Sequence, residues 1–225
     1  MSFIRAIGWI VWKDLVSELR SRESFSSMLF FALAVILIFS FSFSMDREAI
    51  KELIAGVIWV AFGFTGIIGL GKSFTVEMHN DCLEALQISP ASKGAIYLGK
   101  LLANLLFILC VEVMLLPLFM IFFNLELLEK LPVLLVIMIG GTLGLSALGT
   151  LFSALTVQIR AREVMLPILL LPMAVPVFIG AVEATRGLLS GQPFDLYRPW
   201  IDLLLVFDVI FTIVSFWVID FVLDD

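Results

Sequence analysis

Charged residues are scarce in this chain of 225 residues. Asp, Glu, Lys and Arg make up only 15% of it, whereas 61% of the residues are hydrophobic. A soluble core of this length could not hide so much apolar surface, so we expect lipid to be the main solvent and exclude a soluble domain. The net charge of −6 is spread over short loops, which predicts neither a nucleic-acid partner nor a polybasic lipid-binding segment.

Cysteine and histidine are also rare. Cys82 lies in a polar segment and Cys110 inside an apolar run, so we expect no disulfide, and neither has a metal-binding or redox spacing. The single histidine, His79, is interpreted as a surface residue, with a ligand role as the alternative. The apolar runs contain no nucleophile–base pair or metal cluster, so we predict no catalytic residue and no metal site.

Six long apolar stretches fill most of the chain. Each approaches or exceeds the roughly 18 to 20 residues that cross a bilayer core as a helix. Backbone amides cannot stay unpaired in hydrocarbon, and barrel strands would show short alternating segments, so we predict an all-α polytopic membrane protein with one domain over residues 1–225. The first stretch lacks a small-x-small cleavage pattern and is kept as a span. The predicted spans are about 24–45, 53–71, 101–125, 131–156, 164–182 and 201–221.

An even number of spans places both termini on one side of the membrane. The basic residues divide unequally between the two faces, and the richer face is expected to be cytoplasmic. That face carries Arg5, Lys13, Arg20, Arg22, Lys72, Lys93, Lys100, Arg160 and Arg162. The other carries Arg47, Lys51, Lys130, Arg186 and Arg198.

Residues 1–22 are predicted to form a cytoplasmic amphipathic helix on the membrane surface. Its apolar stripe consists of Phe3, Ile4, Ile7 and Val11, with Trp9 and Trp12 suited to the headgroup layer. The pattern then decays, because Asp14 and Glu18 fall on the same side as the stripe. We favour the interpretation that the helix leaves the membrane surface there. The alternative is that these acids face a protein neighbour.

Two spans have an unusual amino-acid composition, one rich in small residues and one rich in proline. Small residues in the fourth let another helix approach closely, which predicts packing within the bundle, with a dimer seam as the alternative. Proline in the fifth removes backbone donors, so that helix is expected to be kinked or broken. The packing residues are Gly140, Gly141 and Gly144, and the kink residues are Pro167, Pro172 and Pro176.

Two further spans each contain one acid, Glu112 and Asp208. An acid at the centre of a membrane helix costs about 2.5 to 3.5 kcal/mol on insertion scales, so both need an explanation. They could line a polar path or form an interhelical hydrogen bond that changes during function. The structural alternative, which we slightly favour, is a bond to Asn104, to a serine, or to a carbonyl freed by a fifth-span proline.

Residues 66–73 read G-x-x-x-x-G-K-S, the pattern of a phosphate-binding loop. A working loop follows a buried strand in a soluble α/β domain, whereas this stretch ends a membrane-length apolar run. We therefore reject the nucleotide-binding interpretation. Lys72 is better explained as the basic residue that ends the second span.

The only sizeable polar segment is 72–100. Residues 74–88 can form one helix, and Ser89-Pro90 then breaks it before Ser92 caps the next. At 100° per residue its acids Glu77, Asp81 and Glu84 share one stripe, with Met78, Cys82 and Ala85 on an adjacent less polar face. A solvated surface helix and a protein-docking helix both fit this pattern.

An ordered set of motifs resembles a known family. Glu77 followed by Leu83-Glu84-Ala-Leu86 and Pro90, directly after a span, resembles the cytoplasmic signature of type-2 ABC export permeases. Together with the motifs around it, the chain looks like a member of the haem exporter protein B (CcmB) family over roughly residues 55 to 182. These further motifs are Gly56-Val-Ile-Trp59-Val60-Ala61, Lys100, Gly141-Thr142-Leu-Gly144, Ala154-Leu155-Thr156-Val157 and Leu171-Pro172-x-x-x-Pro176.

The resemblance implies a permease subunit in the bacterial inner membrane that handles haem for c-type cytochrome biogenesis. ATP would act only through a separate CcmA-like subunit, and haem would be a transported or handled ligand rather than a covalent cofactor. Further partners would be CcmC-like, CcmD-like and CcmE-like proteins and a second permease copy. The alternative is a type-2 permease for a lipid, polysaccharide or drug. The implied docking residues for the ATPase are Glu77, Met78, Asp81, Cys82, Glu84 and Ala85.

Haem iron takes His, Met, Cys or Tyr as an axial ligand. The predicted outer loops offer only Met45 and Tyr197. We therefore expect iron ligation to belong to a partner protein.

Overall fold

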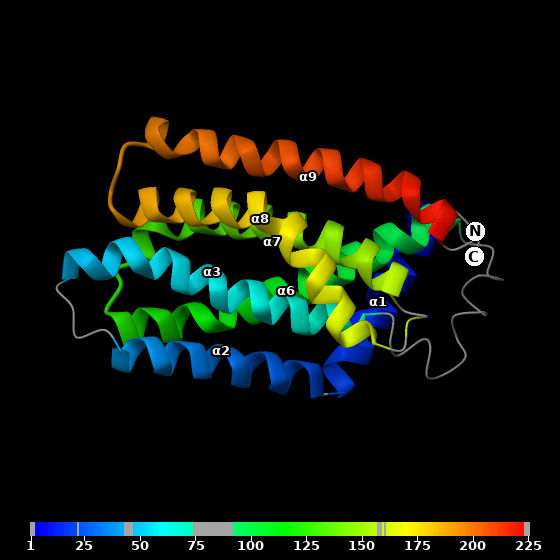
Figure 1. The fold of residues 1–225 in the computed structure, drawn as a ribbon, viewed down its shortest axis with the longest axis horizontal. Helices are drawn as coiled ribbons and strands as arrows, with labels where there is room; N and C mark the ends of the chain where they lie inside the picture. The colour runs from blue at the N-terminus through cyan, green and yellow to red at the C-terminus, as the bar shows by residue number, and fades with distance from the viewer. Residues whose placement is uncertain are drawn as a thin grey trace.

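Helices account for all regular secondary structure in the part of the chain that the structure describes. This computed structural model describes residues 3–21, 23–42, 47–73, 92–156, 159 and 161–222. The predicted all-α class is confirmed. In chain order the helices are α1 (Phe3–Ser21), α2 (Glu23–Ser42), α3 (Arg47–Lys72), α6 (Lys93–Phe123), the short 3-10 helix η1 (Leu128–Lys130), α7 (Leu131–Thr156), α8 (Arg162–Leu189) and α9 (Phe194–Val222) (Figure 1).

Six of these helices, all except α1 and η1, are long and apolar enough to cross a membrane. They run alongside one another as an elongated bundle, and both ends of the chain lie at the same end of it (Figure 1). An even number of spans requires this arrangement. We call this end the terminal end and the other the far end.

The helices extend beyond several of the predicted spans. α3 begins at Arg47, α6 at Lys93 and α9 at Phe194, each before the predicted start, and α8 continues to Leu189. The predicted spans were delimited by uncharged runs, but a helix keeps its backbone hydrogen bonds after it leaves the hydrocarbon core. The predicted polar segment 72–100 therefore loses residues 93–100 to α6.

Both ends of α6 have recognisable caps. The Ser92 side chain accepts a hydrogen bond from the backbone N–H of Ala95 at 3.3 Å, as predicted for a serine at this position. At the other end, Asn124 adopts a left-handed conformation with φ of 51°. Asparagine tolerates that region better than most residues, so it ends the helix before the short connection to η1.

The core of the bundle centres on α7, which packs against α3, α6, α8 and α9. α3 is the most buried span, and α9 and α2 are the least buried. An aromatic cluster ties α3 to α6, with Trp59 edge-on to Phe62 at 5.8 Å and Phe62 edge-on to Phe119 at 6.0 Å between ring centroids. Apolar side chains on the outer faces suit contact with lipid.

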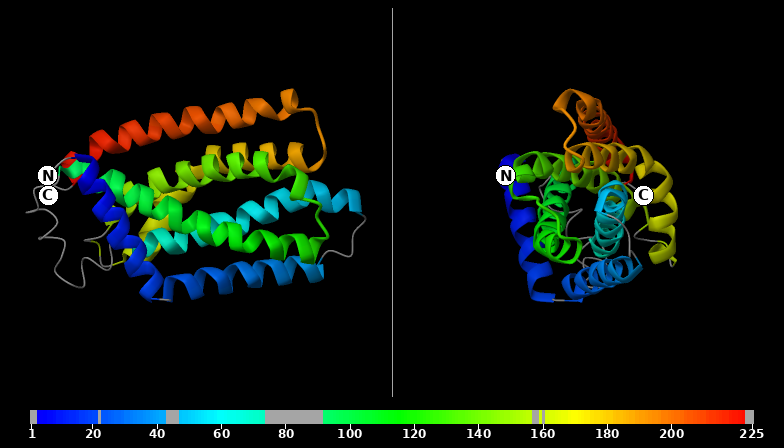
Figure 2. Two further views of the ribbon diagram at one scale, coloured as in Figure 1. Left: turned by 180° about the vertical axis from the view of Figure 1, so that it is seen from behind. Right: turned by 90° about the vertical axis from the view of Figure 1, so that its left-hand side faces the viewer.

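Helix α1 crosses the terminal end obliquely and packs on α6 and α2 (Figure 2). Its buried side carries Ala6 and Ile10, whereas Ile4 of the predicted apolar stripe is 80% exposed. A Cβ atom at Gly99 of α6 would lie 2.8 Å from the Cβ of Ile10, so glycine permits the close approach. The middle of α1 also packs within the chain, through Leu15 against the core and Asp14 against Lys100.

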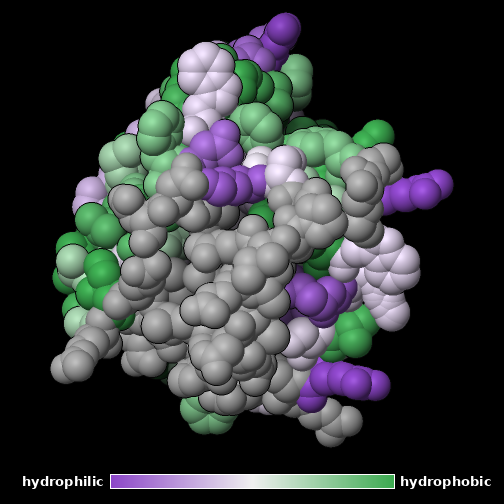
Figure 3. All heavy atoms as spheres, turned by 90° about the vertical axis from the view of Figure 1, so that its right-hand side faces the viewer, coloured by the Kyte–Doolittle hydropathy of each residue, from purple (hydrophilic) through white to green (hydrophobic). Residues whose placement is uncertain are grey.

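The terminal end differs in character from the sides of the bundle. Viewed onto this end, hydrophilic side chains appear at the top and on the right of the picture, and hydrophobic side chains dominate its left margin (Figure 3). This distribution fits a bundle whose sides contact lipid and whose end contacts water and headgroups.

Candidate functional site

The predicted ATPase-docking residues lie outside the described part of the chain, which stops at Ser73 and resumes at Ser92. His79 and Met45 also lie outside it. Docking through this segment therefore stays a prediction. The residues concerned are Glu77, Met78, Asp81, Cys82, Glu84 and Ala85.

A polar joint lies where this segment leaves and re-enters the bundle. Lys100 of α6 is fully buried, and its Nζ donates to the Ser73 carbonyl oxygen at 2.9 Å and to Asp14 Oδ2 of α1 at 3.2 Å. The sequence analysis counted Lys100 among the basic residues of the cytoplasmic face, and the structure buries its side chain inside the bundle. Asp14 faces α6 of the same chain, and whether α1 leaves the membrane surface at this point stays a prediction.

Glu112 of α6 is buried and bonded to α7. The Thr142 hydroxyl lies 2.9 Å from Glu112 Oε1 and 2.8 Å from Oε2, within donating distance of both oxygens. The expected partner classes, Asn104, a serine or a freed carbonyl, were therefore wrong. Thr142 lies within the small-residue stretch, and its hydroxyl could have been recognised in the sequence as a possible donor to Glu112.

Asn104 bonds elsewhere along the same helix pair. Its Nδ2 donates to Thr150 Oγ1 at 2.9 Å, and the Tyr97 hydroxyl donates to the Ala147 carbonyl oxygen at 3.1 Å. With Glu112, these α6 side chains form a polar seam along α7. The seam ties two spans together by hydrogen bonds that do not compete with water in the bilayer.

Asp208 approaches α7 from α9. It is 3% exposed, and neither carboxylate oxygen has a hydrogen-bond partner among the described residues. A Cβ atom at Gly144 would lie 2.7 Å from Asp208 Oδ1, and one at Gly140 would lie 3.8 Å from Oδ2. Both predicted intramembrane acids therefore contact α7. Glu112 is bonded to Thr142, and Asp208 lies against Gly140 and Gly144.

The small residues of α7 contact other helices of this chain. Gly141 faces the indole ring of Trp59, whose Nε1 donates to Thr185 Oγ1 of α8 at 2.9 Å. Gly144 also faces Val177 of α8. These contacts favour packing within the bundle over the dimer-seam alternative.

Helix α8 contains Pro167, Pro172 and Pro176 and is one continuous helix. Its ribbon changes direction along its length while remaining unbroken (Figure 1). Of the two expected outcomes, a kink or a break, the observed geometry corresponds to a kink. A proline without an N–H is tolerated in a span where neighbouring helices cover the freed carbonyls.

The phosphate-loop-like stretch is helical through Lys72, the last residue of α3. A Cβ atom at Gly66 would lie 2.6 Å from Leu145 Cδ2, and one at Gly69 would lie 3.2 Å from Met28 Cε. These glycines therefore permit close helix contacts. Residues 66–72 do not adopt the loop form that cradles phosphate.

Tyr197 was expected in an outer loop as one of few possible haem ligands. It lies instead inside α9, where it is 6% exposed, and its ring packs edge-on against Phe194. The helix starts earlier than the apolar run, so this residue belongs to the bundle. Cys110 is free and exposed on α6.

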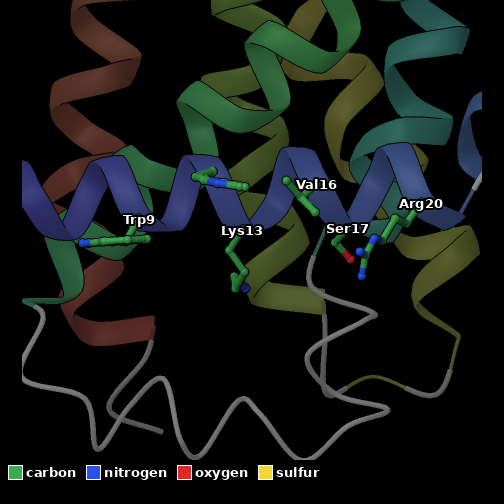
Figure 4. Close-up of a pocket in the computed structure, with 6 residues that line it drawn as sticks. Trp9, Lys13, Val16, Ser17 and Arg20 are labelled. Atoms are coloured by element: carbon green, nitrogen blue, oxygen red, sulfur yellow. The ribbon is translucent and has the colours of Figure 1, made fainter.

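Helix α1 carries an open groove on its outer side. Figure 4 shows Lys13, Ser17 and Arg20 pointing to the same side of α1, with Trp9 lying along the helix. Two indole rings beside cationic groups suit the headgroup layer of a membrane. The lining residues are Trp9, Trp12, Lys13, Val16, Ser17 and Arg20.

Six spans, a surface helix and buried polar pairs define a multi-pass α-helical membrane protein. The model of the family described as CcmB protein matches residues 5–222, and the chain belongs to this family. The resemblance noted in the sequence is thereby confirmed.

Curated relatives agree with this assignment. The chain is 30% identical over 182 residues to heme exporter protein B of Pseudomonas aeruginosa, covering 81% of each chain. It is 29% identical to heme exporter protein B of Rhodobacter capsulatus, covering 82% of this chain and 84% of the relative. For the Escherichia coli K12 protein of the same name the identity is 27%, covering 84% and 86%.

Proposed function

We propose that this chain is the membrane permease subunit of a haem export system that serves c-type cytochrome maturation. The observation that carries the proposal is the family match, which spans residues 5–222 and therefore the whole helix bundle. Relatives named heme exporter protein B align over about four fifths of the chain. The alternative, a type-2 permease for a lipid, polysaccharide or drug, shares the architecture, but the matched family and the named relatives favour haem export.

The permease works without an ATP site of its own. Residues 66–72, the only phosphate-loop pattern noted in the sequence, are helical and packed against neighbouring spans. A CcmA-like subunit supplies ATP hydrolysis and acts on the polar segment 74–91. The resulting motion of the bundle delivers haem or releases a CcmE-like haem chaperone, with CcmC-like and CcmD-like proteins in the same complex and two permease copies.

The terminal end of the bundle faces the cytoplasm of a bacterial inner membrane. This orientation rests on the excess of Lys and Arg predicted for the terminal side, including the described cations Arg5, Lys13 and Lys93. Reporter fusions after Val222 and within residues 124–130 test it. Some reporters are active only outside the cytoplasm. If such a reporter were active when fused after Val222, this orientation would be contradicted.

Deletion of the gene tests the haem function. We expect c-type cytochromes to disappear from haem-stained gels of membranes while other haem proteins remain, and the intact gene to restore them. Staining of the apoproteins with antibodies controls for their synthesis. Normal haem staining in the deletion strain would reject the haem function and favour export of a different substrate.

Charge reversal tests docking of the ATPase. Glu77→Lys with Glu84→Lys should weaken copurification of the ATPase subunit, because acids at a docking surface are replaced by cations. The matched control is Glu126→Lys with Glu129→Lys, the same change in net charge on exposed residues at the far end. Equal ATPase recovery with both double variants would show that the acidic stripe is a solvated surface.

A further inference from the structure

The polar joint around Lys100 connects three separate elements. Its Nζ belongs to α6, the carbonyl that it contacts at 2.9 Å belongs to Ser73 directly after α3, and the carboxylate at 3.2 Å belongs to Asp14 of α1. The Lys100 side chain is completely buried, and that of Asp14 is 15% exposed. A buried ammonium group is stable only with such partners, so it holds all three elements at fixed positions.

The joint is also well packed. Gly99, next to Lys100, lets Ile10 of α1 approach α6 closely, since an added Cβ would lie 2.8 Å from the Cβ of Ile10. Lys13 contacts the other oxygen of Asp14, Oδ1, at 2.9 Å. The carboxylate therefore lies between two cations, one buried and one half exposed. α1 is attached to the bundle here through both apolar and ionic contacts.

The position of the joint along the chain gives it a mechanical consequence. Residues 74–91 connect covalently to Ser73 on one side and to Ser92, the N-cap of α6, on the other. Lys100 bonds directly to the first of these ends and lies about two turns into the helix that follows the second. A displacement of this segment therefore acts on α3 and α6 through the backbone, and on α1 through Lys100 and Asp14.

We propose that Lys100 is a positioning residue that makes α1, the end of α3 and the start of α6 move as one unit when the ATPase subunit acts on the permease. This inference rests on the proposed function and deepens it. The ammonium group performs no chemistry. Without it, α1 stays packed on α6 but follows the other two elements less closely during the cycle, and ATP hydrolysis continues with less haem delivered per ATP.

The test uses the complete complex in a deletion strain. Lys100→Met keeps the length of the side chain and removes the donor. The measurements are c-type cytochrome yield by haem staining, the ATPase rate of the purified complex, and the amount of permease and ATPase subunit recovered. We expect normal recovery and ATPase rate, with cytochrome yield lower by roughly tenfold, the change that loss of one charge-assisted hydrogen bond gives to an equilibrium.

Two further variants separate coupling from stability. Lys93→Met is the matched control, because Lys93 is on the same helix and donates instead to the Asp220 carbonyl oxygen at 3.2 Å; it should keep normal yield. Asp14→Asn leaves the bond between Lys100 and Ser73 in place, so it should fold even if Lys100→Met does not. We expect it to lower the yield per ATP by a smaller factor.

The outcomes discriminate clearly. The proposal is overturned if Lys100→Met or Asp14→Asn is recovered normally and gives the same cytochrome yield per ATP as Lys93→Met. The proposal is also overturned if the cytochrome yield falls only in proportion to the amount of complex recovered. The joint would then contribute to stability alone. Failure of the proposed function looks different, since the deletion strain itself would keep its c-type cytochromes.

Discussion

Replacing Gly141 of α7 by alanine adds only one methyl group, yet we expect it to lower the stability of the fold clearly. An alanine Cβ there would lie 2.5 Å from Trp59 Cζ3 and 3.2 Å from Cζ2, and nearer still to Cη2. The indole ring cannot move away easily, because it is 3% exposed and its Nε1 is bonded to Thr185 at 2.9 Å. Overpacking of this kind costs about 1 to 3 kcal/mol, roughly 5- to 150-fold in the folded population.

The matched control for Gly141→Ala is Gly56→Ala in α3, where an added Cβ meets nothing within 4 Å. Both changes gain the same helix propensity, so the difference between the two variants isolates the collision with Trp59. In detergent, Gly141→Ala should unfold at a lower temperature than the control by roughly 2 to 12 °C, taking soluble-domain scaling. Adding Trp59→Leu should recover part of this loss. Equal stability of the two alanine variants would refute the packing argument.

The remaining predictions concern the two intramembrane acids. Thr142→Val removes the donor to Glu112 and should destabilise the protein by about 1 to 3 kcal/mol in thermal unfolding. The control is Thr65→Val, which should be neutral because the buried Thr65 hydroxyl has no partner among the described residues; similar losses for both would contradict this reasoning. Asp208→Asn preserves side-chain size and should keep assembly but lower the yield of c-type cytochromes. An unchanged yield at normal protein level would remove Asp208 from the functional residues.

The number and type of the spans could be predicted from the sequence, since only helices bury such long uncharged runs in lipid. The ends of the helices could not be predicted equally well. Arg47 and Lys93 are charged, and a count of uncharged residues stops before them, yet both belong to helices. Ser92 was the exception, because a serine after a proline break carries its own capping signal.

Partners across the bundle were harder to predict than helices. Lys100 follows a polar segment, so its sequence context resembles that of an interfacial base, and only the fold brings it to Asp14, 86 residues away. Thr142 was hidden in the same way, since a hydroxyl among glycines resembles a packing residue. Periodicity places a side chain on a face of its helix, but the identity of the facing helix depends on tertiary packing.

Gly144 and Asp208 were predicted as separate features, one for packing and one as an acid in a span, and the structure makes them interdependent. Any residue with a Cβ at position 144 would approach Asp208 Oδ1 to 2.7 Å, so only glycine leaves room for the carboxylate against α7. Conversely, a larger side chain at position 208 would collide with the α7 backbone that the glycine exposes. Because Asp208 is 3% exposed, it cannot relieve such a collision by turning outward without moving α9 away from α7. A change at either position therefore acts on the contact between these two helices.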